Sequence, residues 1–373
     1  MKFLFFSGQA HLALDPSSSR ASGGAELQVA LLAEELVARG HHVTLVVSDK
    51  SQEDRALLRG IRVRVAQNFH CGTLWRTFLA IPAVMAILAE EKPQFVAIYG
   101  WTAWLYLFAK WRKFFSYSLL FICALDSEIE RTVVYTNRWR EWLFQRGMYL
   151  CDHRFAITEH QQKLFHQRGM SCSLTRLLLQ KNDASSFLKK EGDKQKKTID
   201  LLWVARCHWI KQPLLFLELA ERFPKARCQM ICSHQDQKLW ERLQSELPKV
   251  RNIEFLGAAP YQHIQTYFNH AKIFVNTSLE EGVPNTFIHA GLGHCALVSL
   301  CVDPDGMFSR FGVGGCAQNK KEYFFQLIDQ LLREEHRLLL AQEEAARFIR
   351  TWHQNEENVN SFLQGLEGLI KLN

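Results

Sequence analysis

The chain has 373 residues, of which 47% are hydrophobic and 12% aromatic; this is enough for packed cores and excludes a disordered protein. A chain of this length is expected to form two domains. The net charge is +7, but the basic residues are not concentrated in a recognisable nucleic-acid motif, so we expect no nucleic-acid partner.

The cysteines and apolar runs indicate a cytoplasmic protein without a membrane span. The ten cysteines form no C-x-x-C pair, and most lie in apolar runs, which favours reduced thiols in a core. The apolar N-terminus is interrupted after Phe6, too soon for a signal peptide. The longest apolar stretches, 78–89 and 114–125, are shorter than the ~20 residues that cross a membrane. We expect both to be buried elements.

Strand-like and helix-like segments alternate along residues 1–180, the expected N-terminal domain. The predicted strands are 2–6, 42–47, 62–65, 95–98, 118–123 and 153–157. The predicted helices are 25–39, 74–90, 139–150 and 161–169, and residues 7–24 are expected to form a polar loop. This alternation predicts a mostly parallel, doubly wound sheet.

A lysine-rich break, 181–198, is predicted to be a linker, and the same alternation then resumes over 199–352. The predicted strands are 199–204, 228–232, 253–256, 273–276 and 296–301, and the helices are 212–223, 237–247, 261–270 and 285–291. A helix within the C-terminal segment, 353–373, is expected to pack back toward the N-terminal domain. The fold class is therefore α/β, with two Rossmann-like domains facing across a ligand cleft.

The most informative stretch is Asn276–Ala290, NTSLEEGVPNTFIHA. A strand ends there, a turn rich in Ser, Glu, Gly and Pro follows, and a helix begins near Asn285. A helix that starts after a strand offers free backbone N–H groups and its positive dipole end to a phosphate. Glu281 at its mouth indicates a ligand with hydroxyls as well as phosphates, such as a nucleotide sugar.

Two cations form the second candidate site. Arg206 and Lys211 follow the predicted strand 199–204 and flank the next helix, where they could clamp a diphosphate. Gly23-Gly24 stands at a loop-to-helix junction and either admits a ligand phosphate or forms a simple turn. Asp126 ends the strand 118–123 and is either an acceptor-orienting base or the N-cap of a helix.

Three further patterns are weaker. Residues 291–296, GLGHCA, match G-x-G-x-x-A but lie after a helix and before a strand, so we expect a helix-ending turn and no nicotinamide cofactor. The histidines show no zinc-protease spacing, and no metal site is expected. Residues 101–115 interleave aromatic and basic side chains, which is typical either of a bilayer-interface segment or of an amphipathic core helix.

Together these motifs resemble the retaining glycosyltransferases of family 4, which have the GT-B fold. GGAELQ at 23–28 resembles their glycine loop, VARCHWIK at 204–211 their phosphate-binding segment, and 277–290 their donor-sugar motif. The run VDPDG at 302–306 is similar to one in many bacterial cell-surface polysaccharide members.

The resemblance implies a role for each matching residue. Glu281 would bond the donor sugar, and Arg206 and Lys211 would neutralise the leaving diphosphate. Asp126 would act on the acceptor. The remaining donor-binding positions are Gly23, Gly24, Gly282, Val283, Pro284, Asn285, Thr286 and His289. The family usually has a glutamate at the position of His289 and a histidine before Asp126, where this chain has Leu125.

The sequence therefore predicts a metal-independent, retaining glycosyltransferase without a cofactor. Its donor would be UDP- or GDP-linked, and its acceptor a glycan or lipid-linked sugar at the inner membrane surface, in cell-surface polysaccharide biosynthesis. Three alternatives remain open: an inactive nucleotide-sugar-binding partner protein, a nucleotide-sugar epimerase of the same fold, and a membrane-surface scaffold.

Overall fold

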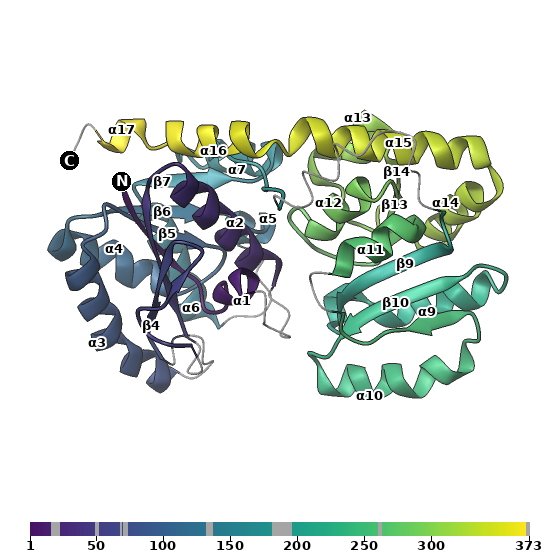
Figure 1. Cartoon of the computed structure of the whole chain (residues 1–373), viewed down its shortest axis with the longest axis horizontal. Coiled ribbons are helices and arrows are strands. Elements are labelled where there is room, and N and C mark those ends of the chain that lie inside the picture. Colours follow the sequence, from purple (N-terminus) through teal and green to yellow (C-terminus); the bar gives the residue numbers. More distant parts are fainter. Residues whose placement is uncertain are drawn as a thin grey trace. The chain divides into compact units, whose positions relative to one another are not determined.

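The computed structural model describes residues 1–15, 23–48, 52–67, 69, 74–131, 137–180, 196–259 and 263–370 (Figure 1). It divides into two compact units, Met1–Leu178 with Asn355–Asn373, and Leu179–Gln354. Most of the predicted linker, 181–195, lies outside the described residues. Each unit contains a sheet of mainly parallel strands with helices, which confirms the predicted α/β class with two Rossmann-like domains.

The first unit is built on an eight-stranded sheet of order β3-β4-β2-β1-β5-β6-β7-β8. Its strands are β1 Lys2–Phe6, β2 His42–Val47, β3 Leu57–Leu58, β4 Ile61–Val65, β5 Phe95–Tyr99, β6 Ser118–Ile122, β7 His153–Ala156 and β8 Ser173–Leu174. Only β3 pairs antiparallel among the described strands. The central strands are almost continuously apolar because helices cover both faces of such a sheet. The two-residue strands β3 and β8 were not predicted.

The helices of the first unit include the four predicted ones, each with ends within two residues of the prediction. The described helices of this unit are α1 His11–Leu14, α2 Gly24–Ala38, α3 Leu74–Glu91, α4 Trp104–Phe115, α5 Asp126–Glu130, α6 Arg138–Leu150, α7 Glu159–Gln167, α16 Asn355–Gln364 and α17 Glu367–Ile370. The short α1 corrects the predicted loop 7–24. The Ser361 hydroxyl donates to the Leu174 carbonyl at 2.6 Å, so α16 packs on β8 within this unit.

Two parts of the apolar-stretch prediction were wrong. Phe78 on α3 is 60% exposed and Phe114 on α4 is 79% exposed, so neither stretch is buried throughout. Both residues lie on helices whose other faces pack on the core, and sequence hydrophobicity does not tell one face from the other. Within the described residues, no helix has the length and apolarity needed to cross a membrane.

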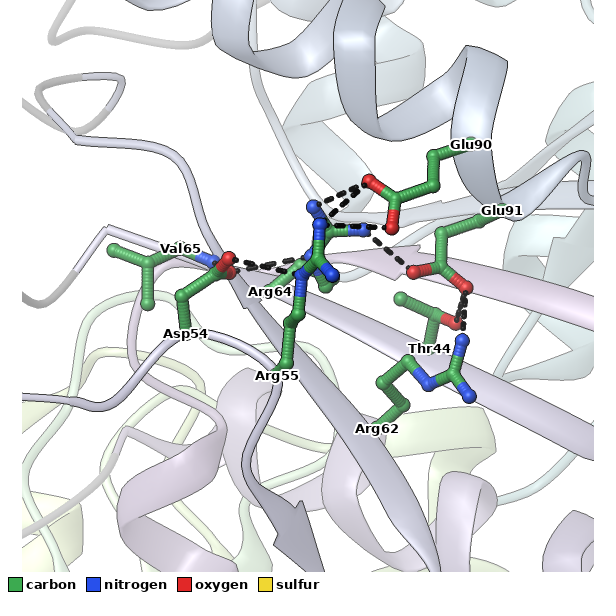
Figure 2. A network of polar contacts seen from close by, with 8 residues as sticks. All are labelled: Thr44, Asp54, Arg55, Arg62, Arg64, Val65, Glu90 and Glu91. Carbon is green, nitrogen blue, oxygen red and sulfur yellow. Dashed lines mark hydrogen bonds and ion pairs between the residues drawn. The ribbon is translucent and has the colours of Figure 1, made fainter.

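A buried arginine joins the last turn of α3 to β4 (Figure 2). The Arg64 guanidinium donates to Glu91 at 2.6 Å, to Glu90 at 3.0 Å and to Asp54 at 3.2 Å. The Arg64 side chain is 6% exposed, whereas Arg55, which pairs with Glu90 from outside, is 66% exposed. A single desolvated cation thus holds three carboxylates and fixes a helix end to the sheet.

The second unit has a six-stranded sheet of order β11-β10-β9-β12-β13-β14, in which every described pair is parallel. Its strands are β9 Ile199–Arg206, β10 Cys228–Ser233, β11 Ile253–Phe255, β12 Ala271–Asn276, β13 Ala296–Ser299 and β14 Gly314–Cys316. Strand β14 was missed because Gly314-Gly315-Cys316 lacks an apolar run. Gly314 is required there: its φ is +141°, and a Cβ would lie 1.8 Å from the Leu297 carbonyl oxygen.

The α-helices of this unit are α9 Pro213–Arg222, α10 Gln237–Glu246, α11 Ile264–His270, α12 Asn285–Leu292, α13 Met307–Phe311, α14 Lys321–Arg333 and α15 Glu335–Trp352. Short 3₁₀ turns are η1 Trp209–Lys211, η2 Leu247–Lys249 and η4 Pro304–Gly306. Helices α13, α14 and α15 were not predicted. Gly293 ends α12, so residues 291–296 form the expected helix-ending turn. The described cysteines are free thiols, mostly buried; Cys71 lies outside the described residues.

Candidate functional site

The loop after β12 is shaped by its own polar side chains. The Asn276 side-chain oxygen accepts the Ser278 backbone N–H at 2.9 Å, which turns the chain immediately after the strand. The Asn276 amide also donates to the Glu281 carboxylate at 2.9 Å. Asn276, Thr277 and Ser278 are all buried. The strand end therefore fixes the position of Glu281.

Glu281 forms an ion pair with Lys211, with 2.6 Å between Lys211 Nζ and Glu281 Oε2. Each side chain is 18% exposed. Burial favours the protonated form of Glu281, but Lys211 and hydrogen bonds from Ser278 and Asn276 outweigh it and leave its pKa below the ordinary value. Glu281 is consequently an anion held in place at neutral pH.

The two loops that carry this pair are tied by their backbones. The Leu279 N–H donates to the Ile210 carbonyl at 2.9 Å. The Trp203 indole donates to the Thr277 hydroxyl at 2.8 Å, and that hydroxyl contacts the Lys211 carbonyl. These bonds connect the ends of the neighbouring strands β9 and β12. Lys211 and Glu281, distant in sequence, are thereby brought to one edge of the sheet.

Arg206 takes a different place from the one predicted. It is the last residue of β9 rather than a loop residue, and it is exposed. Burial, Arg206 and Lys211 together lower the pKa of His208, so both cations act on this imidazole. His208 was not singled out from the sequence, although it lies between the two predicted cations. Its Nδ1 accepts the Ile210 N–H and helps to form η1.

Helix α12 begins at Asn285, as predicted, with Pro284 at its N-cap. Proline has no side-chain oxygen, so the N-cap residue itself supplies no side-chain hydrogen bond to this helix end. Gly282, Val283, Asn285 and Thr286 are half-buried along the turn. The helix start thus presents backbone N–H groups beside the Lys211–Glu281 pair, which is a suitable arrangement for a phosphate.

His289 lies in the packing between α11 and α12. Its Nδ1 is 2.8 Å from the Gln265 side-chain oxygen, and its ring stacks on Phe268 at 5.6 Å. Burial lowers its pKa to about 4, so the imidazole is neutral at physiological pH. The Gln265 contact indicates that Nδ1 carries the proton. A role of His289 toward a ribose stays a prediction, since this ring nitrogen is already engaged.

The predicted glycines of the first unit lie at the start of α2. Gly23 is the N-cap and Gly24 the first helical residue. A Cβ on Gly23 would lie 2.2 Å from a Glu26 carboxylate oxygen, so that carboxylate folds back over the helix start. A phosphate at this end would require the Glu26 side chain to move. Residues 16–22, which precede this helix, lie outside the described residues.

The end of β6 holds a second buried carboxylate, Glu128. Its Oε2 accepts the Ala124 N–H at 2.8 Å. Burial raises its pKa to about 7, although backbone N–H groups, including that of Trp101, favour the charged form. Glu128 was assigned no role from the sequence. Its position two residues after Asp126, at a strand end, was the available signal.

Asp126 is the first residue of α5, and Leu125 occupies the N-cap position, so the N-cap interpretation was wrong. The Asp126 carboxylate lies 3.8 Å from Nε2 of His160, which comes from the start of α7. Both side chains are about half exposed. An imidazole therefore accompanies Asp126 from another helix, which a sequence cannot reveal.

Comparisons with known proteins find family matches in both halves of the chain. Residues 22–176 match the model of Glycosyltransferase Family 4, and residues 198–334 match that of Glycosyl transferases group 1. No curated protein matches the chain by sequence.

Solved structures share the fold at low identity. Sucrose-phosphate synthase from Thermosynechococcus elongatus is 14% identical, covers 100% of both chains and has a TM-score of 0.80. Anabaena HepE in complex with UDP is 14% identical over 99% of this chain and 100% of its own, with a TM-score of 0.71. UDP-GlcNAc 2-epimerase from Neisseria meningitidis is 14% identical over 94% of this chain and 99% of its own, with a TM-score of 0.65. By its two family matches and its fold, the chain belongs to the GT-B glycosyltransferases.

Proposed function

We propose that this protein transfers a sugar from a UDP- or GDP-linked donor to a glycan or lipid-linked acceptor, with retention of configuration, in cell-surface polysaccharide biosynthesis. The observation that carries the proposal is the Lys211–Glu281 pair, whose glutamate lies in the turn that leads into α12, a helix with Pro284 at its N-cap. It places a cation, a charged carboxylate and backbone N–H groups at one edge of a parallel sheet. A diphosphate needs the first and third of these groups, and sugar hydroxyls need the second.

In the proposed reaction the bond between the anomeric carbon and the diphosphate breaks, and a bond to the acceptor oxygen forms. Negative charge grows on the leaving diphosphate, where Lys211, Arg206 and the α12 N–H groups would stabilise it. Glu281 would hold the sugar hydroxyls. The proton of the acceptor hydroxyl would pass to the leaving phosphate or to Asp126. These charges supply what a divalent metal otherwise supplies, and the proposal therefore includes no metal.

Retention enters the proposal from the family resemblance. We assign no covalent nucleophile, so attack from the face of the departing diphosphate is proposed. The anomeric configuration of the product, read by proton NMR, tests this part separately. An inverted product would overturn retention and leave the transfer itself in place.

The test of transfer measures nucleoside diphosphate release by the purified full chain from a panel of UDP- and GDP-sugars. Each donor is offered with and without a pool of glycan and lipid-linked acceptors. One donor should be consumed only when acceptor is present, and Lys211→Ala should lose most of that turnover. Lys225→Ala, at an exposed lysine before β10, is the matched control.

Two outcomes would replace the proposal. Donor binding without turnover on any acceptor indicates an inactive partner protein. Conversion of a nucleotide sugar in the absence of acceptor indicates an epimerase, and the epimerase among the solved structures shows that this fold can host that activity.

A further inference from the structure

Helix α6 exposes one narrow row of aromatic and basic side chains. Trp139 is 40% exposed, Trp142 56% and Tyr149 63%, and Arg146 between them is also exposed. Spacings of three, four and three residues place all four on one side of a helix. Phe144, Gly147 and Met148 lie on the opposite side, in the core. The row is therefore the solvent-exposed side of a helix whose opposite side packs in the core.

Helix α4 extends this row into a broader surface. The Tyr106 ring lies 5.9 Å from the Trp142 ring, and the Lys110 ammonium lies 5.3 Å from the centroid of the Tyr106 ring. The two helices approach closely, because a Cβ on Gly147 would lie 2.6 Å from the Tyr106 backbone nitrogen. We call Tyr106, Lys110, Trp139, Trp142, Arg146 and Tyr149 the α4/α6 surface.

This surface is strongly basic. Helices α4 and α6 carry six basic side chains, Lys110, Arg112, Lys113, Arg138, Arg140 and Arg146, and a single acidic one, Glu141. Glu141 is turned inward, where one carboxylate oxygen accepts the Trp101 indole N–H at 3.0 Å and the other the Gln145 amide. Arg112 is paired with Asp152. Lys110, Lys113, Arg138 and Arg146 are exposed on the same two helices.

Four aromatic residues of 101–115 behave differently from those of α6. Trp104 and Phe108 are buried in the core, and Trp101 and Trp111 pack against it. The bilayer-interface interpretation of that segment thus fails for these four rings. The two tryptophans of the α4/α6 surface come from α6, which the sequence did not single out as an interface element.

We propose that the α4/α6 surface binds the anionic headgroup layer of a lipid bilayer. Tryptophan and tyrosine side chains favour the boundary between headgroups and acyl chains, and exposed lysines and arginines are attracted to acidic lipids. The row lies on a convex helix side, which suits an extended plane. This inference goes beyond the proposed sugar transfer and does not depend on it.

The experiment is co-sedimentation of the full chain with two kinds of vesicle. One contains phosphatidylcholine with about one anionic phosphatidylglycerol in four lipids, and the other contains phosphatidylcholine alone. Wild type should bind the anionic vesicles, and raising the salt should weaken binding. Trp139→Ser/Trp142→Ser and Lys110→Glu/Arg146→Glu should each lower the partition coefficient about tenfold or more.

Matched variants control for exposed apolar and basic residues elsewhere. Leu339→Ser/Leu340→Ser removes comparably exposed side chains from α15, and Lys225→Glu/Lys238→Glu reverses two exposed lysines of the second unit. Both should bind vesicles as wild type does. Circular dichroism and the melting temperature verify that each variant is folded.

Four results would overturn the proposal. Wild type fails to bind anionic vesicles, or the α4/α6 variants bind as well as their controls. In the third, sedimentation analysis shows a dimer that these variants dissociate while vesicle binding is unchanged, which assigns the surface to a second copy. Displacement from vesicles by a soluble anionic polysaccharide at equal charge concentration would assign it to a glycan instead.

Discussion

Each unit places a largely enclosed glutamate shortly after a strand, yet the pKa values of the two glutamates move in opposite directions. Glu281 follows β12, and the pair with Lys211 and the side-chain hydrogen bonds keep its pKa below the ordinary value. Glu128 follows β6 and accepts backbone N–H groups, but no cation is among the causes of its shift, and burial raises its pKa to about 7. The same residue type at a similar position is thus a fixed anion in one unit and close to half protonated at neutral pH in the other.

The difference shows that a strand end does not define a site by itself. Backbone N–H groups only partly offset the cost of burying a carboxylate, whereas a cation with further donors reverses it. A fixed anion can hold neutral sugar hydroxyls, and its paired cation can turn to a phosphate. We therefore assign donor binding to the Glu281 side and a supporting role to Glu128, which holds the loop that carries Asp126.

The largest expected effect is that of Lys211→Ala, which removes the cation that distinguishes the surroundings of Glu281 from those of Glu128. Glu281 would lose its cation, and the leaving diphosphate would lose a stabilising charge. We expect turnover to fall by roughly 10² to 10³, the usual loss for one group that stabilises transition-state charge. Steady-state kinetics with the consumed donor measures it, with Lys225→Ala as control. A loss below about threefold would remove Lys211 from the mechanism.

The second prediction concerns the cluster around Arg64, to which we assign no catalytic role. Arg64→Met would leave Asp54, Glu90 and Glu91 without their shared cation, and we expect it to destabilise the first unit by about 3 kcal/mol. Arg55→Met removes an exposed arginine from the same cluster and should cost less than about 1 kcal/mol. Denaturant unfolding followed by hydrogen exchange of β4 peptides measures both. Equal effects would show that burial does not set the strength of this network.

Glu128→Gln tests the pH dependence of the first unit. The folded-state pKa of Glu128, about 7, lies above its ordinary value. Its contribution to stability is therefore present below pH 4.5 and is lost as the pH rises through 7, by up to about 3 kcal/mol. Hydrogen exchange of β5 and β6 peptides between pH 4.5 and 8 should show this loss in wild type and not in the variant. Parallel profiles would mean that Glu128 titrates normally.

The smallest expected effect separates the roles of the two units. Asp126→Asn should lower turnover about tenfold, as expected for one lost charge-assisted hydrogen bond to the acceptor, and should leave donor affinity unchanged. His160→Ala keeps Asp126 and should change turnover less. Kinetics at saturating donor and titration of donor binding measure the two quantities. Weaker donor binding in Asp126→Asn would place this residue at the donor instead.

The fold was largely predictable because the strands are apolar runs with polar ends. Strand β2 was predicted with the bounds that the structure gives, and most others within two residues. Strand β14 could not be predicted from an apolar run, because Gly314 and Gly315 have no apolar side chain. They allow close packing against Leu297 and Leu327 instead. Helix α14 did carry a signal: Phe324, Ile328 and Leu331 recur at helical spacing and are buried.

The sequence identified candidate residues of the site but not the contacts between them. Lys211 and Glu281 were each identified from strand-end positions, whereas their 2.6 Å pairing depends on adjacent strands β9 and β12, which are distant in sequence. His160 beside Asp126 depends in the same way on the start of α7. The buried setting of His289 follows from α11, whose Gln265 and Phe268 no local pattern connects to it.

The most direct test of the account is nucleotide binding by the second-unit site. Melting temperatures of wild type, Lys211→Ala and Lys225→Ala are measured with UDP, GDP, ADP and their common sugars. A ligand at 100 times its Kd adds about 2.7 kcal/mol of stability, which such a scan detects. The account predicts that UDP or GDP and its sugars stabilise wild type and Lys225→Ala and lose their effect in Lys211→Ala. Stabilisation by no nucleotide, or equal stabilisation of all three proteins, would contradict it.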